Sequence, residues 1–234
     1  MRVKNSTEFQ AIIGYRFKDQ TLIEKALTHN SFVKEKELSR LNGNERLEFL
    51  GDAFFDAIIG EALYISFPEV EEGFLTKVRA SIVCEKSLLK EGEKLQIGQY
   101  LKIGRGEEKS GGRARASIIA DAMEAVIGAV YLDGGYEAAK GHVLRTFGEA
   151  LENALEGKFD NADYKSELQE ILQGKGILDI QYHLEKEDGP DHSKTFFVSV
   201  KVDGKKLGCG SGGSKKEAEQ RAAKDGIERG LHVF

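Results

Sequence analysis

Three observations predict a two-domain protein, in which an all-α domain is followed by a small α+β domain. Up to about Glu156, apolar residues recur at intervals of three and four, as in amphipathic helices. After Asp163 the order becomes one helix, three segments that alternate with period two, and a final helix. Residues 157–162 form a short, polar segment that contains glycine. This predicts a linker between a first domain at 5–156 and a second domain at 163–232.

The bulk composition excludes several classes of protein. Hydrophobic residues make up 40% of the 234 residues, which is too many for a disordered chain. The sequence has no signal-peptide pattern and no apolar stretch near the ~20 residues of a membrane span, so we expect no membrane partner. Cys84 and Cys209 lie far apart, which favours a reducing, cytoplasmic location over a disulfide framework or a cysteine metal site.

A helix predicted over Asn44–Gly60 carries a stripe of like charges. Glu45, Glu48, Asp52 and Asp56 follow at steps of three, four and four, so their carboxylates share one helix face. A solvated face is the ordinary explanation for such a stripe, and Asp56 is expected to be merely solvated. Like charges four residues apart nevertheless cost roughly 0.2–0.5 kcal/mol per pair, and no base lies nearby in the stripe to offset them.

Gly51 lies in the middle of the same helix. A glycine there lowers the stability of the helix by about 1 kcal/mol relative to alanine, because it gives the unfolded chain more conformational freedom. Its presence therefore indicates that a ligand or another backbone approaches the helix closely at this point.

A second pair of acids lies on the most apolar predicted helix, residues 117–132. Asp121 and Glu124 are nearly its only charged residues. A helix that is apolar on all sides is buried, and a buried carboxylate must be protonated, paired or bound to a metal ion. Together with Glu48 and Asp52, this pair predicts a site for one or two hard cations, Mg²⁺ with Mn²⁺ as a substitute.

Other metals fit this pattern less well. Zinc prefers histidine or cysteine, and the five histidines show no metal-ligand spacing. His29 is expected to be a hydrogen-bonded core or interface residue. Because Mg²⁺ is usually completed by a phosphate oxygen, phosphoryl chemistry is the substrate class that the acids indicate.

The C-terminal segment predicts a three-stranded sheet between two helices. Asp203 and Gly204 are a two-residue hairpin signal between the second and third strands. Ser214 and Glu217 predict a capping box at the start of the last helix. The residues expected to share a strand face are Ile180, Tyr182 and Leu184 in the first strand, and Phe196, Val198, Val200 and Val202 in the second.

Three groups of polar residues in this domain suggest contact with nucleic acid. Bulk charge is not the mechanism, because the chain carries a net charge of −5 and the domain holds 12 Lys and Arg against 13 Asp and Glu. Separated contacts that read duplex shape fit better, although the last group taken alone is better explained as an ordinary turn into a capped helix. The groups are Gln169 and Gln173 in the first helix, His192 and Lys194 in a strand–strand loop, and Ser214, Lys215 and Lys216 at the last helix.

Two long motifs carry a resemblance to a known family. The segments NERLEFLGDA (44–53) and ADAMEAVIGAVYLDGG (120–135) resemble the signature of bacterial ribonuclease III. The segments GPDHSKTFFVSV (189–200) and SKKEAEQRAA (214–223) resemble a double-stranded-RNA-binding domain. The resemblance covers essentially the whole chain and implies a helical endonuclease domain that forms a homodimer, joined by a short linker to an RNA-binding domain.

The resemblance also implies an activity and its residues. The activity is Mg²⁺-dependent hydrolysis of double-stranded RNA to 5′-phosphate and 3′-hydroxyl ends with short 3′ overhangs, in the processing of ribosomal RNA precursors and other structured transcripts, without a small-molecule organic cofactor. The implied residues are Glu48, Asp52, Asp121 and Glu124 as metal ligands, with Asp52 and Glu124 most critical, Glu45 and Glu72 as supporting acids, and Phe49 at the dimer interface.

Two alternatives stay open. A dimeric protein could hold duplex RNA without cutting it, although four intact acids count against an idle site. A helical, metal-dependent phosphohydrolase could act on small molecules, although the C-terminal domain would then have no role.

Overall fold

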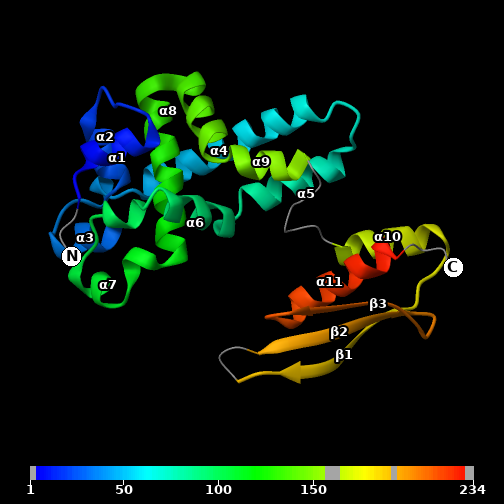
Figure 1. Cartoon of the computed structure of the whole chain (residues 1–234). Coiled ribbons are helices and arrows are strands. Elements are labelled where there is room, and N and C mark those ends of the chain that lie inside the picture. The colour runs from blue at the N-terminus through cyan, green and yellow to red at the C-terminus, as the bar shows by residue number, and fades with distance from the viewer. Residues whose placement is uncertain (1–3, 156–163, 191–193, 230–234) are drawn as a thin grey trace. The chain divides into compact units, whose positions relative to one another are not determined.

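The structure, a computed structural model, describes the chain at residues 4–155, 164–190 and 194–229. Two units are distinguished by their internal contacts, residues 1–161 and residues 162–234 (Figure 1). The linker predicted at 157–162 lies outside the described residues.

The first unit is helical, as the spacing of its apolar residues predicts. Among its described residues, no helix is both long enough and apolar enough to cross a membrane. Three short 3-10 turns also occur, at Arg40–Asn42, Ile97–Gln99 and Gly112–Ala114. The helices are α1 (Ser6–Ile13), α2 (Gln20–Ala26), α3 (Asn30–Glu35), α4 (Glu45–Ser66), α5 (Glu72–Ile82), α6 (Glu85–Lys94), α7 (Arg105–Lys109), α8 (Ala116–Thr146) and α9 (Gly148–Leu155).

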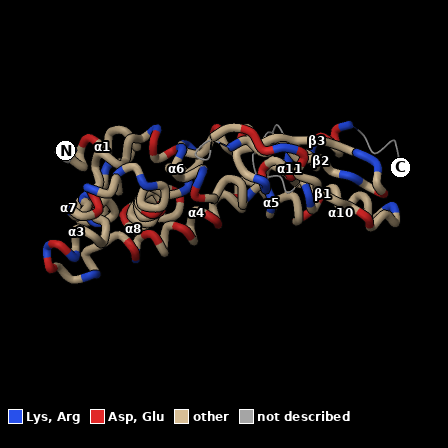
Figure 2. Tube along the Cα trace, turned by 90° about the horizontal axis from the view of Figure 1, so that it is seen from below, with Lys and Arg blue, Asp and Glu red and all other residues tan. Residues whose placement is uncertain are grey.

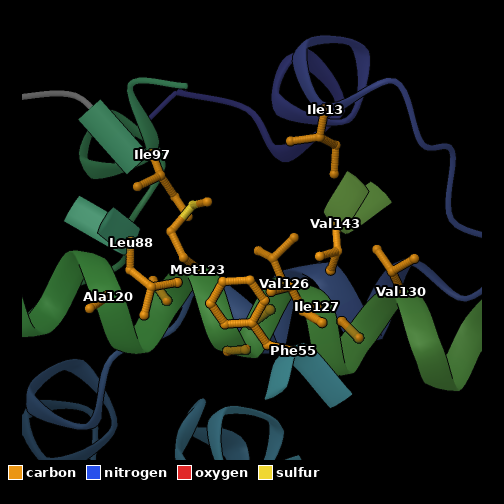
Figure 3. Packing of buried hydrophobic residues seen from close by; sticks show 14 of the residues in the cluster. Ile13, Phe55, Leu88, Ile97, Ala120, Met123, Val126, Ile127, Val130 and Val143 are labelled. Atoms are coloured by element: carbon orange, nitrogen blue, oxygen red, sulfur yellow. The ribbon is translucent and has the colours of Figure 1, made fainter. Parts of the chain in front are cut away.

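The packing of α4 against α8 forms the centre of this unit. Phe55 of α4 is fully buried and lies beside Met123 and Val126 of α8 (Figure 3). Most of the α8 positions between Ile118 and Val130 are buried, which agrees with a helix that is apolar on almost every side. This helix pair therefore forms a rigid base for the acids that it carries.

Two glycines allow the backbones of α4 and α8 to touch. A Cβ atom on Gly51 would lie 1.8 Å from the carbonyl oxygen of Glu124, and one on Gly128 would lie 2.3 Å from the carbonyl oxygen of Leu47. Any larger residue at either position would force the helices apart. The sequence-based expectation of a close approach at Gly51 is confirmed, and the approaching group is another backbone.

The start of α4 is fixed by contacts with distant segments. Asn44, which is buried, donates its backbone N–H to the carbonyl oxygen of Thr28 at 2.9 Å. Thr28 in turn forms an isolated parallel bridge with Lys102. The first turn of α4, which carries Glu45 and Glu48, is therefore held against the loop that enters α3.

A carboxylate in the middle of α8 ties this helix to the segment that enters α2. Asp133 accepts hydrogen bonds from the backbone N–H groups of Lys18 and Asp19 and from the hydroxyl of Tyr15. Gly135 then leaves helical geometry with φ 79° and kinks α8, a left-handed conformation that favours glycine. The LDGG part of the sequence motif therefore anchors α2 to α8.

The second unit has the predicted α-β-β-β-α order. Its strands form an antiparallel sheet in the order β1-β2-β3, and both helices pack on one face of it (Figure 1). Leu168 and Leu172 of the first helix meet the small residues of the last helix in this core. The elements are α10 (Tyr164–Gly174), β1 (Ile180–Asp188), β2 (Thr195–Val202), β3 (Lys205–Gly212) and α11 (Lys215–Glu228).

The turn and cap signals of this unit are confirmed in most details. Asp203 and Gly204 both have positive φ, 48° and 75°, as a two-residue hairpin turn requires. The Ser214 hydroxyl accepts the N–H of Glu217 at 3.2 Å. The Glu217 carboxylate reaches back to the N–H of Gly213, one residue earlier than a standard capping box predicts.

The first strand keeps its predicted face as far as Leu184. Ile180, Tyr182 and Leu184 were expected to share a face, and this is confirmed because they lie opposite alternate residues of β2, namely Val202, Val200 and Val198. Leu184 is nevertheless 43% exposed. A β-bulge shifts the register of β1 between Leu184 and Lys186. Because β1 is an edge strand and a bulge bends the strand locally, its second half lies apart from the core.

Adding a methyl group at the helix contact tests its role. Gly128→Ala should lower the free energy of unfolding of the first unit by about 1–3 kcal/mol, because the new Cβ overlaps the α4 backbone. Gly141→Ala on the same helix is the matched control, since nothing lies within 4 Å of a Cβ there and alanine favours helix. Urea denaturation followed by circular dichroism measures both. Equal stability of the two variants would contradict the helix contact.

Candidate active site and nucleic-acid interface

The α4–α8 pair brings together five acids, which we call the acidic cluster. Glu48, Asp121 and Glu124 are half-buried, whereas Glu45 and Asp52 are exposed. The members of the cluster are Glu45, Glu48 and Asp52 from α4, and Asp121 and Glu124 from α8. The sequence therefore predicted correctly that the two helices would meet, but Asp52 is more exposed than the apolar character of α4 suggested.

Burial and mutual repulsion raise the pKa of two members of this cluster. The pKa of Glu48 rises to about 7, first because of burial and then because of the charges of Asp121, Glu45 and Asp52. The pKa of Glu124 rises to about 8, again mainly through burial, with Asp52 as the strongest neighbouring charge. The charges that act on these two groups are all carboxylates, so the cluster is a site of concentrated negative potential.

A histidine lies close enough to Asp121 to act on its charge. Burial raises its pKa, and the nearby imidazole of His29 is the strongest opposing charge. His29 begins α3 as its cap, since its Nδ1 accepts the N–H of Ser31 at 3.2 Å and lies 2.8 Å from the Ser31 hydroxyl. The sequence predicted a hydrogen-bonded histidine, but its proximity to Asp121 could not be found from spacing.

Two acids named from the sequence lie apart from the cluster. Asp56 is not simply solvated as expected, because Arg79 of α5 approaches its carboxylate at 3.7 Å. Glu72 is exposed in the first turn of α5, where it accepts a hydrogen bond from the Thr76 hydroxyl at 2.6 Å. Among the described residues, neither acts on the pKa of Glu48 or Glu124.

The donor set of the cluster fits a hard divalent cation. It offers carboxylate oxygens alone, which suit Mg²⁺ and Mn²⁺, and a cation would relieve the repulsion that raises the pKa of Glu48 and Glu124. Within the described residues, no three His, Cys, Asp or Glu side chains already converge in a metal-binding arrangement. The fit therefore rests on the chemistry and charge of the donors.

Phe49 is the most exposed large hydrophobic residue of α4. Its side chain is 80% exposed, one residue after Glu48. A large aromatic ring that extends into water beside a functional cluster is typical of a surface covered by a partner.

In the second unit, two of the predicted RNA-facing groups meet. Gln169 and Gln173 of α10 and Lys216 of α11 line one cavity of about 600 Å³. Lys and Arg are interspersed with Asp and Glu along the described part of this unit (Figure 2). Local placement, as the sequence suggested, distinguishes these residues from the rest of the surface.

The remaining groups lie at the start of α11 and in the loop before β2. Ser214 is the cap of α11, so its hydroxyl is engaged by the Glu217 N–H. Lys194 and Lys215 both approach the carboxylate of Glu187, a residue that the sequence-based prediction missed. His192 lies outside the described residues.

Comparison with known proteins gives matches over both units. Residues 19–151 match the family model described as ribonuclease-III-like, and residues 164–229 match the double-stranded RNA binding motif. The protein named Ribonuclease 3 from Caldanaerobacter subterraneus subsp. tengcongensis is 48% identical over 95% of this chain and 97% of its own length. Ribonuclease 3 from Pelotomaculum thermopropionicum is also 48% identical, over 92% of this chain and 89% of its own length.

A solved structure resembles the first unit. The nuclease domain of ribonuclease III from Campylobacter jejuni, in a structure that concerns a region involved in dimer formation, superposes with a TM-score of 0.59. It is 40% identical and covers 63% of this chain and 99% of its own.

The raised pKa values predict how stability changes with pH. Glu48 and Glu124 keep their protons to about pH 7 and 8 in the folded state, whereas their ordinary pKa is 4.5. Between these values the folded state binds more protons than the unfolded chain, so their contribution to stability falls as pH rises. Glu124→Gln removes one such group. Without divalent cations, its melting temperature should therefore fall less than that of the wild type from about pH 5 to pH 8.

The comparison between variants is needed because other groups titrate as well. The buried imidazole of His142 has a pKa lowered to about 4, which favours folding as pH rises, but it is present in every variant. Glu72→Gln removes an acid outside the cluster and should keep the wild-type pH dependence. If the curves of Glu124→Gln and the wild type run parallel, the pKa of Glu124 is not raised in the folded state as described.

Proposed function

Because the chain belongs to the ribonuclease III family, we propose that this endoribonuclease is a Mg²⁺-dependent enzyme that hydrolyses the phosphodiesters of double-stranded RNA. Its products carry 5′-phosphate and 3′-hydroxyl ends with short 3′ overhangs. It acts as a homodimer in the cytoplasm, on ribosomal RNA precursors and other structured transcripts, and accepts Mn²⁺ in place of Mg²⁺.

One observation carries the proposal. Acids from two helices far apart in sequence meet at the α4–α8 contact, where burial and mutual repulsion raise the pKa of Glu48 to about 7 and that of Glu124 to about 8. A protein has no structural need for such a concentration of like charge, which destabilises the fold unless a cation balances it. The residues that would hold the ion are Glu48, Asp52, Asp121 and Glu124.

Two of these acids are proposed to be the most critical for hydrolysis. Within the cluster, Asp52 of α4 is the neighbouring charge that acts most strongly on Glu124 of α8. This pair therefore combines one acid from each helix. A bound divalent ion supplies charge stabilisation to the phosphodiester during hydrolysis. Asp52 and Glu124 hold that charge at the boundary between the exposed and the buried parts of the cluster.

The supporting acids have unequal support. Glu45 raises the pKa of Glu48, so it already contributes to the potential of the cluster. The proposed role of Glu72 rests on the resemblance of the chain to the family. The hydrogen bond from the Thr76 hydroxyl fixes the Glu72 carboxylate at the start of α5.

The second unit is proposed to present the duplex to this site. Gln169, Gln173 and Lys216 line one cavity, and uncharged amide groups beside lysines suit a surface that reads the minor groove and neighbouring phosphates. The other proposed contact residues are His192, Lys194, Ser214 and Lys215.

The dimer is supported by Phe49. Its 80% exposed ring lies beside Glu48, so a partner subunit that covers it also comes close to the acidic cluster. Two subunits then supply one cluster for each strand of a duplex, which yields a staggered cut.

Removing one ligand should separate binding from cleavage. Glu124→Gln keeps the shape of the side chain but removes its charge, so cleavage of a labelled duplex with Mg²⁺ should fall by about a hundredfold or more. Duplex binding in a chelator should stay at the wild-type value, because the RNA-contacting residues are in the other unit.

Lys140→Gln is a charge-changing control on the same helix, at a lysine that pairs with Glu61 away from the cluster. It should cleave at nearly the wild-type rate. Full cleavage by Glu124→Gln would rule out its role as a ligand, and wild-type protein that binds the duplex but leaves it uncut with Mg²⁺ would support a binding protein instead.

Truncating the exposed ring should weaken the dimer. Phe49→Ala is expected to raise the dimer dissociation constant at least about tenfold, since buried aromatic anchors dominate interface energies. Sedimentation velocity at several protein concentrations measures it. Leu178→Ala, at a 78% exposed residue of the second unit, is the control and should leave the dimer unchanged. A Phe49→Ala protein that dimerises like the wild type would remove Phe49 from the interface.

A further inference from the structure

Glu187 holds two lysines that were predicted, independently of it, to contact RNA. One carboxylate oxygen lies 3.3 Å from Nζ of Lys215 at the start of α11, and the other lies 3.8 Å from Nζ of Lys194 in the loop before β2. The Lys215 ammonium group also lies 5.8 Å from the ring centre of Phe196. One acid therefore connects two of the three elements proposed to meet the duplex.

The register of the sheet explains how this contact forms. Glu187 pairs with Phe196 on β2, and Phe196 pairs with Gly212 on β3. These three residues form one row across the sheet, and the chain enters α11 at Lys215, three residues after Gly212. Because this row ends at Gly212, the start of α11 places Lys215 close to Glu187.

The β-bulge in β1 decides which face Glu187 occupies. Residues directly opposite each other on antiparallel strands share a face, so Leu184 lies with Val198 before the bulge. The single extra residue reverses the alternation, and Glu187 then lies on the same face as Phe196. Lys186 lies on the opposite face, where its ammonium group is 5.8 Å from the ring centre of Phe197.

The position of the carboxylate has a consequence for binding. A phosphate that contacts either lysine must approach within about 6 Å of Glu187, because the carboxylate already lies within 4 Å of both ammonium groups. At about 6 Å in water, the repulsion between two unit charges changes an affinity about threefold at low salt. The nearby carboxylate therefore offsets part of the affinity for the duplex that each lysine contributes.

We propose that Glu187 is an affinity-determining residue that competes with the phosphates of duplex RNA for Lys194 and Lys215. The inference rests on the proposed RNA-binding role of this unit. In the unbound protein the single charge of Glu187 offsets part of the charge of both lysines, and binding replaces the carboxylate by phosphate. The competition lowers duplex affinity and thereby speeds release of cleaved duplex.

The test compares two variants of the full chain that each remove one negative charge. Glu187→Gln keeps the size of the side chain and removes the competing charge. Asp188→Asn is the matched control, because it removes the same charge one residue later, from a carboxylate that pairs with Lys186 at 2.6 Å. Binding is measured in a chelator by fluorescence anisotropy, with a labelled duplex of about 30 base pairs, longer than one such domain covers.

Glu187→Gln should bind about threefold more tightly than the wild type at about 50 mM salt, and its affinity should fall more steeply up to about 200 mM. Asp188→Asn should change affinity less. Lys215→Gln should weaken binding. Glu187→Gln should then bring a smaller gain in the Lys215→Gln background than in the wild type, because only one of the two lysines, Lys194, is left for the carboxylate to compete for.

The outcomes separate the two proposals. If the wild type does not bind duplex RNA, the proposed function fails and the inference with it. If the wild type binds and Lys215→Gln weakens binding, but Glu187→Gln is no tighter than Asp188→Asn, the inference alone is overturned. Weaker binding by Glu187→Gln also overturns it, because the carboxylate would then position the lysines without competing. Circular dichroism melts establish that each variant is folded.

Discussion

The backbone contact between α4 and α8 is the constraint on which the first unit depends. Gly51 and Gly128 leave no side chain between the helices, so the carbonyl oxygens of Glu124 and Leu47 lie where Cβ atoms would otherwise be. This closeness brings carboxylates from both helices into one electrostatic field. The same two glycines therefore determine both the packing of the core and the spacing of the acids.

The acidic cluster lowers the stability of the fold, and the surrounding core offsets this cost. Burial and repulsion raise the pKa of Glu48 and Glu124, and this cost is met by the large apolar core around Phe55 and Met123. Asp133 ties the middle of α8 to the segment that enters α2, and the Thr28–Asn44 contact holds the start of α4. The acids of the cluster are thus held in place by packed helices.

The second unit solves a different electrostatic problem. Its charges are mixed along the whole unit, so its contact with a duplex depends on where individual side chains lie (Figure 2). The bulge after Leu184 turns Glu187 toward Lys194 and Lys215, and the sheet register carries α11 to the same place. The proposed competition between Glu187 and phosphate would suit an enzyme that must bind a polyanion and then release its products.

The sequence by itself determined the local features of this protein. The helical spacing of the first unit, the Asp203–Gly204 turn and the Ser214 cap all follow from repeats of a few residues, because backbone geometry fixes which neighbours share a face. The tertiary structure alone decided the rest. The approach of His29 to Asp121, the pairing of Asp56 with Arg79 and the position of Glu187 join segments that are distant in sequence or lie beyond a bulge. Such contacts depend on how whole elements pack, and no periodicity within one element encodes them.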